Sequence, residues 1–196
     1  AFERRRLRDR ALRNEARLQA FLDNTPSPTF IKDTEGRYLH VNPRFLQAFG
    51  IDAAAVIGRT DAEVFGPEQA ATFTGNDRRV LETGAPITFE ERARYVDGPH
   101  VSLVTKFPLR DMHGKVYALG GIATDITGRE AAERQFRMTF EQATVGITHT
   151  SLDDRYLLAN RRFCEMLGYS REEILGMTTR DIAHPDDKDQ DLQQRE

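Results

Sequence analysis

The chain has 196 residues, of which 39% are hydrophobic and 30% charged, a composition typical of a soluble globular protein. Its formal net charge of −3 gives no whole-chain argument for nucleic-acid binding, and no apolar run approaches the roughly 18 residues that a membrane span requires. The single cysteine, Cys164, excludes an intramolecular disulfide framework and is compatible with a reducing cytosol.

Residues 1–22 contain no glycine or proline and are rich in helix-forming residues, so we expect an N-terminal helix there. A heptad spacing of 4-3-4-3 connects five positions, Leu7, Ala11, Asn14, Leu18 and Phe21. We therefore expect two copies of this helix to form a coiled coil, with the asparagine fixing register and oligomeric state. The arginine-rich face could instead contact RNA or an anionic membrane, but acidic residues interrupt it, and we favour a solvated coil.

The following residues, 23–126, have the element order of an α+β domain. Two short strands joined by the turn at residues 33–36 form a hairpin, and short helical segments follow. A longer helix is expected over residues 67–83, before three strands at 87–96, 101–109 and 115–124. This order predicts one antiparallel sheet with helices on one side.

The segment GGIATDITGRE, residues 120–130, joins the last of these strands to a second long helix, expected at residues 127–142. Thr127 and Glu130 have the spacing of a capping box. In that motif the threonine hydroxyl accepts a bond from a backbone N–H three residues on, and the glutamate accepts one from the threonine N–H. Such a cap would couple the sheet rigidly to a helix that leaves the domain.

The sequence repeats with an offset of 118 residues, which places Asn42 on Asn160. Of the 24 positions in residues 37–60, nine are identical to the positions 118 residues later. A period of domain size indicates tandem domains. We therefore expect a helix at 1–22, a complete domain at 23–126, a connecting helix at 127–142 and the first half of a second domain at 143–196.

Several segments resemble the PAS family. In the first copy they are residues 38–45 (YLHVNPRF), Gly50, residues 57–61 (IGRTD) and residues 121–127 (GIATDIT). In the second copy they are residues 159–176 (ANRRFCEMLGYSREEILG) and the sequence HPDD at residues 184–187. No single motif carries the resemblance, but the set of motifs in this order is specific.

The resemblance implies a PAS fold, which is a five-stranded antiparallel sheet in the order 2-1-5-4-3 with helices over one face and a ligand cavity between them. It also implies homodimers formed through the flanking helices. The family serves as the input module of larger bacterial signalling proteins, including histidine kinases and diguanylate cyclases or phosphodiesterases. Its Asp-Ile-Thr motif couples the last strand to the signalling helix, so Asp125, Ile126, Thr127 and Glu130 are the expected coupling residues.

The same resemblance argues against two cofactors. Flavin-binding light sensors of the family carry a reactive cysteine, but the first copy has none, and Cys164 is more simply explained as a core thiol. Haem-binding members use a histidine on the long helix, and residues 61–84 contain no histidine. The five histidines have no metal-ligand spacing, and no phosphate-binding glycine loop, nucleophile elbow or HExxH motif is present. We expect no metal site, no catalytic residue and no enzymatic activity in this chain.

The resemblance implies that Ala123 faces inward, and strand alternation from this position gives the candidate pocket. Its residues are Phe45, Phe49, Phe73, Arg92, Arg94, Ser102, Val104, Lys106, Leu119, Gly121 and Ala123. A cation on the cavity side of a sheet is costly unless it is paired, and two explanations remain open. Either Glu90 pairs with Arg92 while Lys106 reaches solvent, or Arg92 or Lys106 holds a small anionic ligand such as a carboxylate.

These observations favour a cytoplasmic sensory module, or the cytosolic part of a membrane-tethered receptor. It would bind a small ligand, or relay a conformational change, through dimeric helices to a C-terminal output domain outside this sequence. A ligand-free dimerisation spacer is the main alternative, and a flavin or haem sensor is a third. Because the sequence does not begin with methionine, we expect it to be part of a longer protein.

Overall fold

The computed structural model describes residues 2–183, and the chain divides into two compact units at the boundary between Gly128 and Arg129. The first unit begins with helix α1 (Phe2–Asp23), as the sequence predicted. Two prolines, Pro26 and Pro28, follow this helix and cannot continue it.

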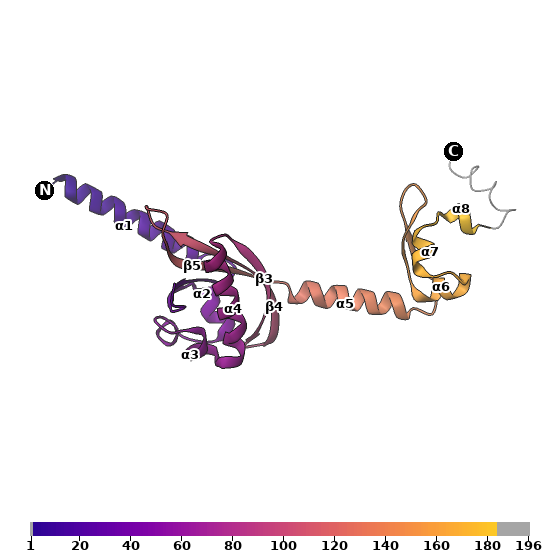
Figure 1. Ribbon diagram of the computed structural model, residues 1–196, viewed down its shortest axis with the longest axis horizontal. Coiled ribbons are helices and arrows are strands. Elements are labelled where there is room, and N and C mark those ends of the chain that lie inside the picture. The colour runs from indigo at the N-terminus through magenta and orange to yellow at the C-terminus, as the bar shows by residue number, and fades with distance from the viewer. Residues whose placement is uncertain (1, 184–196) are drawn as a thin grey trace. The chain divides into compact units, whose positions relative to one another are not determined.

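The first unit contains a five-stranded sheet in the order β2-β1-β5-β4-β3, with antiparallel pairs throughout (Figure 1). Its strands are β1 (Thr29–Asp33), β2 (Tyr38–Val41), β3 (Ile87–Tyr95), β4 (Gly98–Arg110) and β5 (Val116–Asp125). Since β1 pairs with both β2 and β5, the first hairpin continues the later three-stranded meander in one sheet. The predicted α+β class and strand order are confirmed.

Helical segments connect β2 to β3 and lie on one side of the sheet (Figure 1). They are α2 (Pro43–Phe49), the 3-10 helix η1 (Ala53–Ala55), α3 (Asp61–Phe65) and α4 (Pro67–Thr83). The sequence did not predict α3, which begins with a capping box formed by Thr60 and Glu63. This short helix brings its first residue, Asp61, into the interior, where it is 2% exposed.

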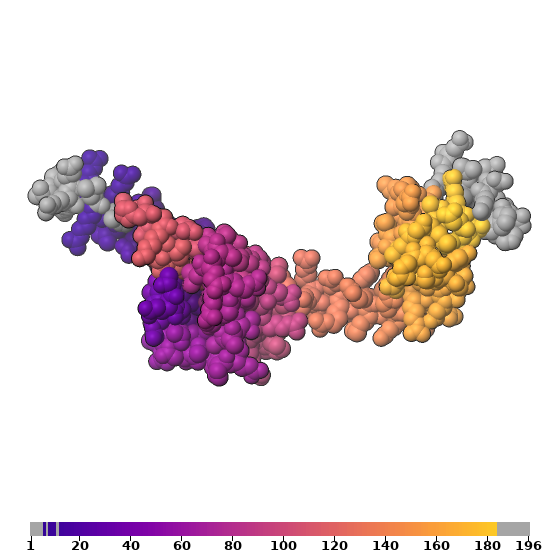
Figure 2. All heavy atoms as spheres, viewed as in Figure 1, coloured from indigo at the N-terminus to yellow at the C-terminus, as the bar shows by residue number. Residues whose placement is uncertain are grey.

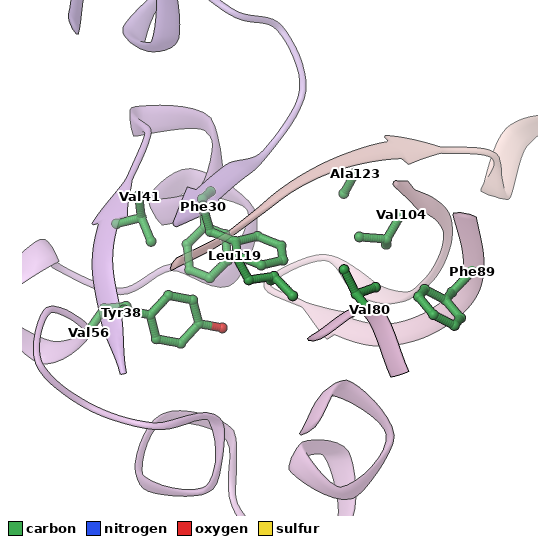
Figure 3. Packing of buried hydrophobic residues seen from close by; sticks show 10 residues of the cluster. Phe30, Tyr38, Val41, Val56, Val80, Phe89, Val104, Leu119 and Ala123 are labelled. Atoms are coloured by element: carbon green, nitrogen blue, oxygen red, sulfur yellow. The ribbon is translucent and has the colours of Figure 1, made fainter. Parts of the chain in front are cut away.

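The core of the first unit joins side chains of the hairpin to side chains of β5 and of the helices. Figure 3 shows Phe30, Tyr38 and Leu119 directed into the same interior space, and the two aromatic rings lie 6.0 Å apart edge to face. A Cβ atom at Gly121 would overlap the Phe30 ring. The glycine is therefore required for the close approach of this ring to β5.

Asn42 connects α1, β1 and α2. Its Oδ1 accepts hydrogen bonds from the backbone N–H groups of Thr29 (3.0 Å) and Phe45 (2.9 Å), and its Nδ2 donates to the Leu22 carbonyl (3.2 Å). Asn42 is fully buried, so these bonds satisfy a polar group that has no access to water. We call this set of contacts the asparagine junction.

The second unit repeats the beginning of the first. Its elements are the greater part of α5 (Thr127–Gln142), then β6 (Thr148–Thr150), β7 (Tyr156–Ala159), α6 (Arg161–Leu167), α7 (Arg171–Leu175) and α8 (Thr179–Ile182). Asn160 forms a second asparagine junction, accepting from the N–H groups of Ile147 and Phe163 and donating to the Phe140 carbonyl. The HPDD sequence lies outside the described residues.

Candidate functional site

A cavity of about 40 Å³ lies inside the first unit, enclosed by side chains from the sheet and from α2, α3 and α4. Seven of the predicted pocket residues line it, namely Phe45, Phe49, Phe73, Ser102, Val104, Lys106 and Ala123. Leu119 and Gly121 are buried but belong to the core beside the cavity. Most of the wall is aromatic, and Phe49 lies 4.6 Å from Phe65 and 4.9 Å from Tyr95 between ring centroids.

The placement of Arg92 and Arg94 in the cavity was wrong, because β3 presents the opposite set of residues to the interior. Glu91 pairs directly with Ser102 across the hairpin, and paired residues share a face of the sheet. Glu91, Ala93 and Tyr95 therefore line the cavity. Both arginines are exposed, and Arg92 lies 3.9 Å from Glu90, as the first explanation anticipated.

The expectation that Lys106 reaches solvent was also wrong. Lys106 is 1% exposed, and its Nζ lies 2.6 Å from Asp77 Oδ1 and 2.8 Å from Glu91 Oε1. Lys32, also 1% exposed, lies 2.6 Å from Asp61 Oδ2 and 2.7 Å from Asp77 Oδ2. These five side chains form what we call the buried charge network. Each lysine is paired, which is the condition for keeping an ammonium group away from water.

Polar and aromatic neighbours complete this network. Tyr38 donates a hydrogen bond of 2.6 Å to Asp61, and burial, reinforced by the charge of this carboxylate, raises the pKa of Tyr38 well above its usual value. The ammonium group of Lys32 also lies 4.7 Å from the centre of the Tyr38 ring, within the range of a cation–π contact. Asn76 donates to Glu91 at 2.8 Å. The charged groups of the site are therefore held in place by contacts within the chain itself.

Sequence reasoning missed four members of this network, although two left a trace. Asp77 follows Ala70 and Phe73 and precedes Val80 at helical spacing, so it interrupts the apolar face of α4. Lys32 alternates with Phe30 along β1 and therefore shares its inward face. A charged residue on each of two apolar faces is a signal for a buried ion pair.

The Asp-Ile-Thr motif is fixed to β4, but not by the predicted capping box. Thr127 Oγ1 accepts a hydrogen bond of 2.9 Å from the Val101 N–H, and the Thr127 N–H donates to Asp125 Oδ1 at 2.8 Å. The Ile126 N–H donates to the Val101 carbonyl at 2.9 Å. Asp125 thus takes the capping role assigned to Glu130, which lies 3.9 Å from Arg134 instead, one turn along α5. The threonine is free to bind the neighbouring strand because an aspartate precedes it by two residues.

A histidine on β4 makes further contacts with the Asp-Ile-Thr motif. His100 Nδ1 lies 2.6 Å from Asp125 Oδ2, its Nε2 lies 3.0 Å from Asp97 Oδ1, and Tyr95 stacks on its ring at 4.6 Å. Partial burial acts to lower the pKa of His100, but the hydrogen bonds and charges of the two aspartates outweigh it and raise the pKa. For Asp125, burial acts to raise the pKa, and the bonds from Thr127 and His100 hold it below its usual value.

The expected dimer seam on α1 is exposed where it is described. Asn14 is exposed, and Leu18 and Phe21 are 66% and 74% exposed. The side chains of Leu7 and Ala11 lie outside the described set. Figure 2 shows side chains of α1 (indigo) projecting into solvent. In α5, Phe136 is also exposed and stacks on Phe140, with ring centroids 5.8 Å apart. Apolar residues on both helices are thus available to a partner.

Few residues could hold a cofactor. Cys164 is half-buried in α6 and packs against the core of the second unit. In residues 2–183, no three histidine, cysteine, aspartate or glutamate side chains are grouped to hold a metal ion. Over the same residues, no helix is both long and apolar enough to cross a bilayer.

Comparison with known proteins identifies the family. Models of the PAS fold match residues 22–131 and residues 134–196. The chain belongs to the PAS family. Among curated proteins, this PAS chain is 36% identical over 115 residues to the methanogenesis regulatory histidine kinase FilI of Methanothrix harundinacea, covering 58% of the chain and 13% of FilI. It is 35% identical over 101 residues to a diguanylate cyclase of Vibrio cholerae, covering 50% of the chain and 32% of the cyclase.

Solved structures agree with this assignment. The PAS domain of BvgS from Bordetella pertussis has a TM-score of 0.53 and 25% identity, covering 66% of the PAS chain and 98% of that domain. The phage VqmA–DPO complex has a TM-score of 0.53 and 26% identity, covering 85% of the chain and 76% of VqmA. The chain spans no more than about a third of the two curated relatives, so it corresponds to their PAS regions and not to the whole proteins.

Proposed function

We propose that the first unit senses a small molecule in its interior cavity and that β5 carries the resulting change to α5. The observation that supports this is the position of β5, which reaches both places. Ala123 lines the cavity, and two residues later Asp125 binds His100 and the start of α5. A small displacement of the strand at Ala123 would therefore reach the helix through hydrogen bonds and not through a flexible linker.

The output would be regulated through a homodimer. The exposed apolar residues Leu18, Phe21 and Phe136 on α1 and α5 are suited to pairing with a second copy of the same helices. Relatives that include a histidine kinase and a diguanylate cyclase support a C-terminal output domain of one of these kinds. In this proposal the chain is a cytoplasmic regulatory region without enzymatic activity of its own.

The size of the cavity favours a very small ligand. Typical ligand pockets have roughly 300 Å³ or more, whereas this one has about 40 Å³, so a flavin or a haem would require a much larger opening of the interior. The structural similarity to a VqmA–DPO complex is in keeping with a small-molecule ligand. The same small volume supports the second candidate, a ligand-free dimerisation spacer.

Native mass spectrometry and spin-label distances separate the two candidates. A dimer that carries a defined extra mass supports ligand sensing, and a dimer at the bare polypeptide mass supports the spacer. For the relay, Gln135→Cys is labelled in a Cys164→Ser background, and distances between the two copies of α5 are measured. Filling the cavity with Ala123→Leu should shift these distances, whereas Ile122→Leu, on the exposed face of the same strand, should not. Equal distances in the two variants would contradict a relay through β5.

A further inference from the structure

The buried charge network is a linear series of alternating charges. In order, its members are Asp61, Lys32, Asp77, Lys106 and Glu91, and each is within 2.8 Å of the next. Three carboxylates and two ammonium groups leave one formal negative charge in excess when all are ionised. The series begins with Asp61 and ends with Glu91, and each of these terminal carboxylates contacts only one lysine. The excess negative charge is therefore most easily compensated at one of the two ends.

The two ends differ in how well they are satisfied. At the first, both oxygens of Asp61 bind Lys32, and Tyr38 adds a further hydrogen bond to Oδ1. At the second, Glu91 Oε1 accepts a hydrogen bond from Asn76 and forms an ion pair with Lys106 at 2.8 Å. Within residues 2–183, no side chain or backbone group donates a hydrogen bond to Glu91 Oε2, and although the residue is only 5% exposed this oxygen keeps some accessible surface. Glu91 also lines the cavity, so the under-satisfied end of the network lies there.

The cavity therefore offers an acceptor, whereas both ammonium groups that line it, Lys32 and Lys106, are already paired. Lys32 Nζ donates three hydrogen bonds to Asp61 and Asp77. Lys106 Nζ donates to Asp77 and to the Phe73 carbonyl, at 2.6 and 3.3 Å, and forms an ion pair with Glu91 at 2.8 Å, so each ammonium group has as many oxygen partners as it has N–H groups. An anion entering the cavity would meet an excess negative charge with no cation available to bind it.

The remaining walls suit a cation. Aromatic rings from α2, α3, α4 and β3 line the cavity, and aromatic faces attract cations through their quadrupole. The hydroxyl groups of Tyr95 and Ser102, 3.4 Å apart, can each donate or accept. A terminal carboxylate together with aromatic walls is a combination that selects positive charge over negative charge.

We propose that the ligand of this cavity is a small organic cation of the amine or amidine type, held by a charge-assisted hydrogen bond to Glu91. This inference rests on the proposed ligand-sensing function and replaces the small carboxylate considered from the sequence. The positive charge of the ligand compensates the excess charge of the network, and its N–H group satisfies Glu91 Oε2.

Acetamidinium and acetate test the charge, since they have nearly the same shape and opposite charges. Each is titrated into the isotopically labelled full chain at constant ionic strength, and backbone amide shifts are followed by NMR. Acetamidinium should give saturable shifts at cavity-lining residues of β3, β4 and β5, with a dissociation constant of about 1–10 mM, because so small a ligand rarely binds tighter. Acetate should give no saturable shift.

Two variants and one control locate the binding. Glu91→Gln keeps the shape and removes the charge, so affinity for acetamidinium should fall at least about tenfold. Ala93→Leu fills the cavity without altering the network and should abolish the shifts, which keeps the test valid if Glu91→Gln fails to fold. Glu90→Gln, on the exposed face of β3, should bind as the wild type does.

The contrary outcomes are distinct. Saturable binding of acetate without acetamidinium would overturn the cationic class and leave ligand sensing intact. If Glu91→Gln binds acetamidinium with the same affinity as the wild type, the proposed role of Glu91 is wrong. No response to either ion would overturn this inference, while the relay is judged separately by the spin-label distances.

Discussion

In both units a tyrosine at the start of the second strand points into the core, Tyr38 in the first and Tyr156 in the second. Across the hairpin, Tyr38 pairs with Lys32 and Tyr156 pairs with Thr150. Later in each unit, α3 and α8 begin after a threonine capping box, but the first residue is Asp61 in α3 and Thr179 in α8. The pair of charges is therefore present in one unit and replaced by threonines in the other.

This difference between the two units distinguishes the residues that form the common fold from the charged residues found only in the first unit. The tyrosine, the capping box and the asparagine junction occur in both units, so they belong to the common framework. Burial alone raises the pKa of Tyr156, whereas the charge of Asp61 contributes at Tyr38. Because the described part of the second unit forms the same elements without Lys32 and Asp61, these charges are a property of the first interior and not a requirement of the fold.

Breaking the charge network should have the largest effect on stability. Lys32→Met leaves Asp61 and Asp77 without their shared cation, and removing one partner of a buried ion pair costs about 3–5 kcal/mol. The loss should appear as a lower free energy of unfolding of the first unit, measured by urea unfolding and followed by hydrogen exchange at amides of β1.

Two comparisons sharpen this result. Thr150 occupies the position of Lys32 in the second unit but is exposed, so Thr150→Met should leave the free energy of unfolding of the first unit unchanged. The double exchange Lys32→Thr with Asp61→Thr copies the second unit and should cost less than Lys32→Thr alone, because Asp77 keeps Lys106 and no charge is left unpaired. A loss below about 1 kcal/mol for Lys32→Met would contradict the importance of the pairing.

Removing the asparagine from either junction should destabilise its own unit by a similar amount. Asn42→Ala and Asn160→Ala each leave two backbone N–H groups without their acceptor, at a cost of about 1–3 kcal/mol in the unit concerned. Hydrogen exchange at the Thr29 and Ile147 amides reports the two sites separately. An effect in only one unit would show that the junction is not a shared element.

The smallest effect concerns pH and should be confined to the first unit. The raised pKa of His100 means that its stabilising contribution is complete below the unfolded value of about 6.5 and is lost as the pH rises through the folded pKa. Asp125 has a lowered pKa, so its contribution is present above about 3.9 and is lost as the pH falls through the folded pKa.

Thermal unfolding between pH 6 and 8.5 measures the histidine contribution. The free energy of unfolding should decrease by at most about 1 kcal/mol across this range, the upper end for partly exposed ion pairs. His100→Gln should remove this dependence, and His113→Gln, in the exposed turn before β5, should retain it. If the free energy of unfolding still depends on pH in His100→Gln, another titratable group is responsible for the dependence.

Periodicity and turn residues predicted the strands and most helices, and the resemblance to the PAS family implied the sheet order, but neither fixed which face of β3 points inward. The strand limits of 87–96 and 101–109 did not predict the pairing of Tyr95 with Gly98. That pairing places Glu91 opposite Ser102 and so turns Arg92 outward. One residue of register reverses the face of every side chain on a strand, which is why strand limits alone could not decide the pocket.

The network itself was hidden because its members are distant in sequence. Lys32 lies 29 residues from Asp61 and 45 residues from Asp77, and no local pattern relates such positions. The capping prediction failed for a related reason, since the bond from Val101 to Thr127 spans 26 residues. Local rules identified the residues of the Asp-Ile-Thr motif, but its partners depend on tertiary structure.

The two asparagine junctions have identical spacing along the chain. In each, the asparagine lies 20 residues after the helix carbonyl to which it donates and 13 residues after the first backbone N–H from which it accepts. An incoming helix is thus bound through the same spacing in either unit. Because one residue and its distance along the chain encode this bond, the attachment of the helix would be retained when a unit is duplicated.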